Sequence, residues 1–310
     1  MRFLFTFLLL CIYAASTAQI PSYVPTNGLV GWWPFNGNAN DESGNGNNGT
    51  VYGATLTSDR FGIANRAYGF DGINNYIFIP DNVIFNFESY GQFSISYWVR
   101  FYSFSNLKGS ITICKQNESG DSQDGWCSYA NVDTLLRMRF QNGYPSSLAD
   151  VSITSKIQLN QDYFVTVTFD KIQNQLKHYI DGVLQNQAPV GNGLIGNNNN
   201  GIFIGKPSWV SSNAKGIDGK LDDIAIYNRA LTQQEITQIY TRTIVTSTPD
   251  DTSSNVGIGT INPKRKLHVN DVIRLEPRDT VPSNPAKGDI YYDSELNKLR
   301  YYNGTGWISL

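Results

Sequence analysis

The stretch FSISYWVRF at residues 93–101 alternates large apolar side chains with mostly polar ones. Phe93, Ile95, Tyr97, Val99 and Phe101 fall on one side of an extended chain, because successive side chains of a β-strand point to opposite faces. A period of two over nine residues is typical of a strand with one buried face. The sequence therefore predicts a long strand of a sheet that packs on a core.

Similar short runs occur on both sides of this stretch, and Gly, Asn, Pro and Asp residues bound them. The runs at residues 176–180 and 183–187 flank Asp181-Gly182, a dipeptide preferred in two-residue hairpin turns because both positions need a positive φ. These patterns predict an all-β fold. Its further strands are expected at residues 51–56, 76–80, 109–115, 125–130, 135–140, 162–170, 201–205 and 219–227.

Helical periodicity is confined to residues 231–240. Thr232 and Glu235 have the spacing of a capping box there, so we predict a short helix that closes the domain. Residues 244–255 are rich in Thr, Ser, Asp and Pro, as exposed linkers are. We therefore predict a main domain over residues 19–243 and a small β-rich tail over residues 256–310.

The first residues resemble an export signal. Arg2 precedes an apolar run at residues 3–15, and STA at residues 16–18 has the small-residue pattern of a cleavage site. The run is shorter than the roughly 18 to 20 residues that cross a bilayer. We predict a signal peptide over residues 1–18 and a secreted or cell-surface protein.

Composition and cysteine content narrow the class of protein. Charged residues make up 16% of the chain and the net charge is -2, so the chain lacks the basic excess that nucleic-acid binding requires. Cys114 and Cys127 lie in neighbouring predicted strands of a chain bound for an oxidising compartment. This favours a disulfide bond between them, and two buried thiols are the alternative.

Three motifs follow one another in a recognisable order. They are GLVGWWPF at residues 28–35 with NDESGNGNNGT at 40–50, YGFDG at 68–72 with YIFIP at 76–80, and IDGKLDDIAIYNRALT at 217–232. Together they resemble a laminin G-like domain of the concanavalin A-like lectin/glucanase superfamily. The resemblance implies a jelly-roll β-sandwich of two antiparallel sheets, with binding in loops at one rim and often a calcium ion.

A structural calcium ion is the predicted cofactor. Ca²⁺ takes several oxygen ligands, and Asp41, Asn45, Asn47 and Asp222 offer carboxylate and amide oxygens in loops that the fold could bring together. The alternative is a turn whose Asx side chains hydrogen-bond their own backbone. In a regular strand only one of Asp222 and Asp223 could point into the sandwich, where it needs a partner, and a structural role for Asp222 stays open.

Aromatic side chains are the candidates for ligand contact. Trp209 lies in a loop between two late strands, where an indole can stack on a sugar, although packing of the loop explains it equally well. Trp126 and Tyr129, beside Cys127, are a second choice. Trp32 and the other tryptophans within strands are expected in the core.

The sequence does not predict an enzyme. Some members of the superfamily are β-glucanases, whose chemistry needs two close carboxylates, commonly as Glu-x-Asp-x-x-Glu on one strand. That run is missing from the sequence. His178 and His268 assemble neither a Ser-His-Asp arrangement nor a histidine-rich metal site.

The C-terminal residues have a resemblance of their own. NVGIGTINPKRKLHV at residues 255–269, GDIYYD at 288–293 and LRYYNGTGW at 299–307 resemble segments of phage tail-fibre-like and bacterial surface proteins, and tail fibres are trimeric. We predict a bacterial secreted or cell-surface binding and adhesion module for a glycan or a surface protein. The alternative is a structural or assembly component of a fibre-like protein, with the lectin-like domain as a spacer and a homotrimer formed through this segment.

Overall fold

The computed structural model divides into two compact units, residues 1–245 and 246–310. The predicted signal peptide and linker lie outside the described residues. No helix in the described part is long and apolar enough to cross a membrane. The structure describes residues 20–105, 109–117, 124–141, 147–190, 195–196, 198–208, 215–242, 256–258, 267–269, 277–278, 280–282 and 285–309.

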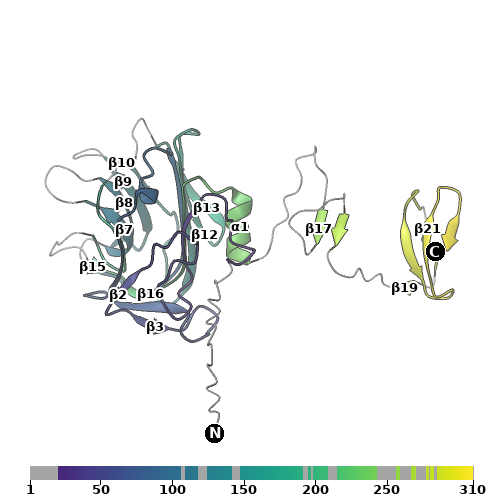
Figure 1. The fold of residues 1–310 in the computed structure, drawn as a ribbon, viewed down its shortest axis with the longest axis horizontal. Helices are drawn as coiled ribbons and strands as arrows, with labels where there is room; N and C mark the ends of the chain where they lie inside the picture. Colours follow the sequence, from purple (N-terminus) through teal and green to yellow (C-terminus); the bar gives the residue numbers. More distant parts are fainter. Residues whose placement is uncertain are drawn as a thin grey trace, which may run out of the picture. The chain divides into compact units, whose positions relative to one another are not determined.

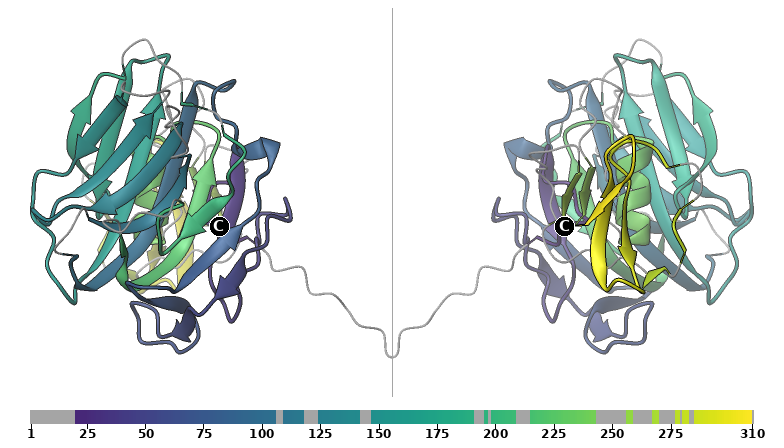
Figure 2. Two further views of the ribbon diagram at one scale, coloured as in Figure 1. Left: turned by 90° about the vertical axis from the view of Figure 1, so that its left-hand side faces the viewer. Right: turned by 90° about the vertical axis from the view of Figure 1, so that its right-hand side faces the viewer.

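The first unit is a sandwich of two eight-stranded sheets, and its two layers are visible in Figures 1 and 2. Its strands pair antiparallel except at the short strand β15. The predicted jelly-roll fold is confirmed. Sheet A contains β13 (Val183–Ala188), β12 (Gln175–Ile180), β11 (Asp162–Asp170), β6 (Gln92–Ser103), β16 (Asp218–Tyr227), β4 (Ala67–Asp71), β3 (Thr55–Thr57) and β1 (Leu29–Trp33). Sheet B contains β10 (Ser147–Ser152), β9 (Leu136–Gln141), β8 (Gly125–Ala130), β7 (Ser110–Gln116), β14 (Ile202–Ile204), β5 (Tyr76–Ile79), β2 (Thr50–Tyr52) and β15 (Lys215–Gly216).

The core lies between the sheets, and β6 shows how the sequence forms it. Its five alternating apolar residues, from Phe93 to Phe101, are buried in the main hydrophobic cluster. Trp98 points the other way and packs against a second cluster on the outer face of sheet A. Each large apolar side chain buried in this way contributes roughly 1.5 to 3 kcal/mol. The period of two in the sequence therefore predicts the inner face of β6 correctly.

Helix α1 (Gln233–Thr241) covers the outer face of sheet A, on the far side from sheet B (Figure 1). The predicted capping box is present, because the Thr232 side chain accepts from the Glu235 backbone and the Glu235 side chain from the Thr232 backbone. Ile236 and Ile239 of the helix pack on Trp32 and other buried residues of sheet A. The helix thus buries a face of the sheet that would otherwise be exposed.

Two turns decide where strands end. Asp181 and Gly182 both have positive φ, at 52° and 77°, so the predicted hairpin between β12 and β13 is confirmed. The single strand predicted at residues 51–56 is wrong. Gly53, with φ 74°, ends β2 in sheet B, and the chain then enters β3 in sheet A.

A short 3-10 helix, η1 (Val83–Phe85), follows β5 and is capped by Asn82.

The second unit contains two small sheets. One is the parallel pair β17 (Val256–Ile258) and β18 (Leu267–Val269). The other has the order β19 (Pro277–Arg278), β20 (Ile290–Asp293), β21 (Lys298–Tyr302) and β22 (Trp307–Ser309). In the second sheet Tyr291 packs edge-on against Trp307, and Arg300 binds Asp293 at 3.2 Å. These contacts hold one face of the sheet together.

Candidate functional site

The loop that follows β1 is fastened by the residues that we predicted to bind calcium. Asp41 Oδ1 accepts hydrogen bonds from the backbone N–H groups of Trp32 (3.0 Å) and Ser43 (2.9 Å), and its Oδ2 accepts from Asn47 N–H (2.9 Å). The side-chain amide of Asn47 donates to the Val30 carbonyl at 3.1 Å. The Asn45 amide donates to the same carbonyl at 3.2 Å. This is the hydrogen-bonded turn that the sequence left open as the alternative.

Asp222 has a different set of partners. Its Oδ2 accepts from Arg60 at 3.1 Å, and its Oδ1 accepts from the Asp223 backbone N–H at 2.8 Å. Each of the four carboxylate oxygens of Asp41 and Asp222 accepts at least one hydrogen bond, which is the structural role that the sequence left open for these side chains. Within the described residues, no group of three or more His, Cys, Asp or Glu could hold a metal. Calcium binding stays a prediction from the family resemblance.

A β-bulge in β16 places Asp222 and Asp223 on the same face of sheet A. Asp222 pairs with Trp98 and Ala225 with Ser96, so β16 has one extra residue here, and Asp223 has φ 47°. A bulge of this kind reverses the alternation of side chains. Our expectation that one aspartate could point into the sandwich is therefore wrong. Both carboxylates bind Arg60 on the outer face instead.

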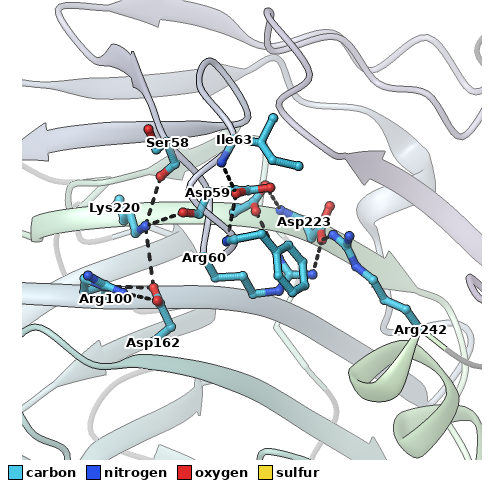
Figure 3. A network of polar contacts seen from close by, with 11 residues as sticks. Ser58, Asp59, Arg60, Ile63, Arg100, Asp162, Lys220, Asp223 and Arg242 are labelled. Carbon is cyan, nitrogen blue, oxygen red and sulfur yellow. Dashed lines mark hydrogen bonds and ion pairs between the residues drawn. The ribbon is translucent and has the colours of Figure 1, made fainter.

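Asp222 and Asp223 belong to a buried polar network on sheet A. Figure 3 shows the network around Arg60 and Asp223. The Arg60 guanidinium lies 3.1 Å from Asp222 and 2.9 Å from Asp223, and it stacks over the Trp98 ring at 4.1 Å. Arg242, at the C-terminal end of α1, binds Asp223 at 2.6 Å. Lys220 of β16 donates to the Ser58 and Asp59 carbonyls at 2.9 and 3.0 Å. The network ties the segment around Arg60 to both the sheet and the helix.

A polar pocket of about 410 Å³ lies beside this network. Tyr23, Glu42, Asp59 and Arg66 contribute to its lining, together with Asp222 and other residues of the network. Burial and the neighbouring Asp223 raise the pKa of Asp222 to about 8, and the same two causes raise the pKa of Glu42. Asp222 and Asp223 already pair with Arg60 and Arg242. The network therefore has a structural role: it holds the Arg60 segment and helix α1 against sheet A.

The aromatic residues predicted to contact a ligand are not exposed where the structure describes them. Trp126 is 1% exposed and packs in the core, with its ring 5.1 Å from that of Phe93. It cannot stack on a ligand, because residue 126 falls on the inner face of β8. Tyr129 lies on the outer face but is buried, and its hydroxyl accepts from Arg139 at 2.9 Å. Trp209 lies outside the described residues.

The predicted disulfide bond is also wrong. Cys114 and Cys127 are directly opposite each other in β7 and β8, yet both are buried thiols, which is the alternative named above. The Sγ atom of Cys114 lies 3.5 Å from the Ser208 hydroxyl, in a loop that follows β14. The backbone pairing of the two strands holds the hairpin without a covalent bond.

A partly exposed group of aromatic side chains on the outer face of sheet B is the best candidate for a binding site. The Tyr52 and Tyr76 rings stack at 4.6 Å with an angle of 10° between their planes. Phe203 lies 5.9 Å from Tyr76 and 4.9 Å from Phe78. The Lys206 ammonium lies 3.6 Å from the centre of the Tyr76 ring. We call these five residues the aromatic surface.

Strand register brings the aromatic surface together. Tyr52 of β2 is paired with Tyr76 of β5, and Phe203 of β14 is paired with Phe78. The isoleucines between them, such as Ile77, point into the core, so the rings must point outward. The alternation in YIFIP and IFI could have shown that these rings share a face. It could not show which strands are neighbours, and the site was missed for that reason.

The two packed antiparallel sheets define a lectin-like β-sandwich. Residues 71–237 match the Laminin_G_3 family model, described as concanavalin A-like lectin/glucanases superfamily. The chain belongs to this superfamily. No curated protein matches it in sequence.

Solved structures with the same fold include binding domains of bacterial toxins. The binding domain of Paraclostridial Mosquitocidal Protein 1 has a TM-score of 0.57 and 20% identity, over 70% of this chain and 52% of that one. The binding domain of Botulinum Neurotoxin DC in complex with SialylT has a TM-score of 0.55 and 20% identity, over 71% and 53%. The present chain thus spans about half the length of these domains.

For a third similar structure, the alignment with the present chain covers almost its whole length. Domain 4 of AbnA, an extracellular arabinanase from Geobacillus stearothermophilus, was solved in complex with arabinotriose. It has a TM-score of 0.50 and 19% identity, over 68% of this chain and 98% of that one. At these identities the likeness establishes a shared fold.

Proposed function

We propose that this chain is a secreted or cell-surface binding module that recognises a glycan or a surface protein, without catalysing a reaction. The observation that supports it most is the aromatic surface of sheet B. Tyr52 is 45% exposed, at the sheet edge formed by β2. Together with the half-buried Tyr76, Phe78 and Phe203 it forms a contiguous group of rings on the surface, which is typical of a binding site.

A glycan is the ligand that this surface suits best. Tyrosine rings provide apolar area for the C–H groups of a sugar, and phenol hydroxyls donate and accept hydrogen bonds with its hydroxyls. The names of several similar structures include glycans, namely two ganglioside molecules, SialylT and arabinotriose, although one of the neurotoxin domains is in complex with rat synaptotagmin II. We therefore place glycan binding ahead of protein binding.

A glycan array with the mature chain tests this proposal, and two tyrosines make a matched pair for it. Tyr52→Ala removes a ring of the aromatic surface, whereas Tyr90→Ala removes an equally exposed ring, also 45%, from the loop before β6. We expect Tyr52→Ala to weaken glycan binding by roughly tenfold, equivalent to about 1.4 kcal/mol. Tyr90→Ala should bind like the parent protein. Equal effects of the two substitutions would exclude the aromatic surface as the site.

The second unit favours an assembly role as a second candidate function. Ile290, Tyr301 and Ile308 are directly opposite one another on β20, β21 and β22. Both isoleucines are exposed, so a row of apolar side chains crosses one face of this sheet. Such a row is typical of a surface that another protein chain covers.

A further inference from the structure

Lys206 contacts aromatic rings instead of an acidic side chain. Its Nζ lies 3.6 Å from the Tyr76 ring centre and 5.2 Å from that of Phe203. A cation over an aromatic face is attracted by the negative potential of the ring's π-electrons. No ion pair between residues that the structure describes includes Lys206. Its charge therefore lies on the aromatic surface with no negative partner among the described residues.

Other lysines of the same unit contrast with Lys206. Lys115 lies 2.8 Å from Asp81, and Lys220 lies 3.7 Å from Asp162. In both lysines the nearby aspartate opposes the lowering of the pKa by burial. At Lys206 burial lowers the pKa, and no aspartate or glutamate of the described residues opposes this change. An anion brought to the Lys206 ammonium would oppose it.

The backbone before Lys206 is fixed by hydrogen bonds on both sides. The Gly205 N–H donates to the Thr112 carbonyl at 2.7 Å, and the Gly205 carbonyl accepts from Ile217 N–H at 3.0 Å. Gly205 has φ 94°, and a Cβ atom there would lie 2.3 Å from the Phe70 ring. Glycine is therefore required at this position. The start of the Lys206 side chain is held in place before any ligand arrives, which lowers the entropy that binding costs.

We propose that the aromatic surface binds glycans that carry carboxylate or sulfate groups, with Lys206 as the partner of the anionic group. This inference rests on the proposed glycan-binding function. The anion accepts a charge-assisted hydrogen bond from the ammonium, a type of bond about twice as strong as a neutral one. The rings of Tyr52 and Phe203 contact the apolar parts of the sugar.

Two matched pairs of polymers test the charge preference. Polygalacturonate is compared with its fully methyl-esterified form, and dextran sulfate with dextran, by titration calorimetry of the full mature chain. We expect the charged member of at least one pair to bind more tightly than its neutral counterpart, and added salt to weaken only the charged one. The pair that shows the difference identifies carboxylate or sulfate as the preferred group.

Variants of two lysines then locate the effect. Lys206→Gln should weaken binding of the charged polymer by roughly tenfold, equivalent to about 1.4 kcal/mol, and Lys206→Arg should retain most of it. Lys215→Gln, which removes an exposed lysine on β15 of the same sheet, should change little. Thermal melts check that each variant folds.

Three outcomes would overturn the inference. If charged and neutral polymers bind equally and Lys206→Gln binds like the parent, the glycan-binding function stands and the charge preference fails. If Lys215→Gln weakens binding as much as Lys206→Gln, the attraction is a diffuse effect of charge. If no polymer binds and the glycan array is also blank, the proposed function fails with it.

Discussion

Arg60 is the residue on which the polar network of sheet A depends most. It contacts both Asp222 and Asp223, and all three side chains are buried. Removing one partner of a buried ion pair costs roughly 3 to 5 kcal/mol, because it leaves an uncompensated charge. We therefore expect Arg60→Gln to lower the free energy of unfolding by about that amount in urea titrations at pH 7.

Asp222→Asn and Arg66→Gln are the controls for this substitution. Burial and the neighbouring Asp223 raise the pKa of Asp222 to about 8, which favours its neutral form, so an amide should replace it at a smaller cost than the loss of Arg60. Arg66 lines the same pocket but is exposed, so its replacement should change stability little. If Asp222→Asn destabilises as much as Arg60→Gln, the charged form of Asp222 carries the stability and this account is wrong.

His178 should make stability depend on pH. It is completely buried on β12, and burial lowers its pKa from 6.5 to about 4. Between these two pH values the unfolded chain binds more protons than the folded protein, so protonation favours unfolding. The contribution of neutral His178 is complete above pH 6.5 and is lost as the pH falls toward 4, by about 3 kcal/mol at 1.36 kcal/mol per pKa unit.

The effect of His178 must be separated from that of Asp222. The raised pKa of Asp222 acts in the opposite direction, since its stabilisation by protonation is lost as the pH rises from 3.8 toward 8. We therefore compare the parent with His178→Gln by urea titration at several pH values. The difference between the two unfolding free energies should grow from pH 4 to pH 6.5 and then stay constant. A difference that does not vary with pH would contradict the lowered pKa of His178.

At the scale of elements, the sequence predicts those features that depend on residues close together in the chain. The alternation in β6, the Asp181-Gly182 turn and the Thr232 capping box depend on residues close together in the chain, and the structure confirms each. The bulge at Asp223 depends on how β16 pairs with β6, where Asp222 lies opposite Trp98, 124 residues earlier in the chain. The sequence around Asp223 does not predict it. The aromatic surface depends in the same way on which strands become neighbours, so its parts were visible in the sequence and their assembly was not.

The cap of α1 is the element-scale feature with the clearest test. The Thr232 side chain accepts from the Glu235 backbone N–H at 3.2 Å, one of the N–H groups that a helix start leaves without a helical partner. Thr232→Ala should cost about 1 kcal/mol in urea unfolding. Thr237→Ala, in the middle of the same helix, should be neutral or stabilising, because alanine has the higher helix propensity. Equal losses would mean that the cap contributes no more than an ordinary helix position.

At the scale of the whole molecule, the two units differ in how they bury apolar side chains. The first encloses a large core between two sheets, and α1 covers a further cluster. The second is small, and domains below roughly 70 to 80 residues seldom gain enough stability from one core. Its row of Ile290, Tyr301 and Ile308 stays on the surface, although the other face of the same sheet holds Tyr291 and Trp307 together. The exposed row therefore suits contact with further copies of the chain.

We accordingly expect the full mature chain to self-associate through this row. Light scattering after size-exclusion chromatography should give the mass of an oligomer, and a threefold mass would support the predicted trimer. Substituting both Ile290 and Ile308 by lysine should produce monomers, because charge on an apolar interface is costly to bury. Leu296→Lys is the control, since Leu296 is 53% exposed but lies in the turn between β20 and β21. If the parent protein is monomeric at micromolar concentration, the row is no self-association surface. The assembly function then fails, and glycan binding by a single chain is the function that is left.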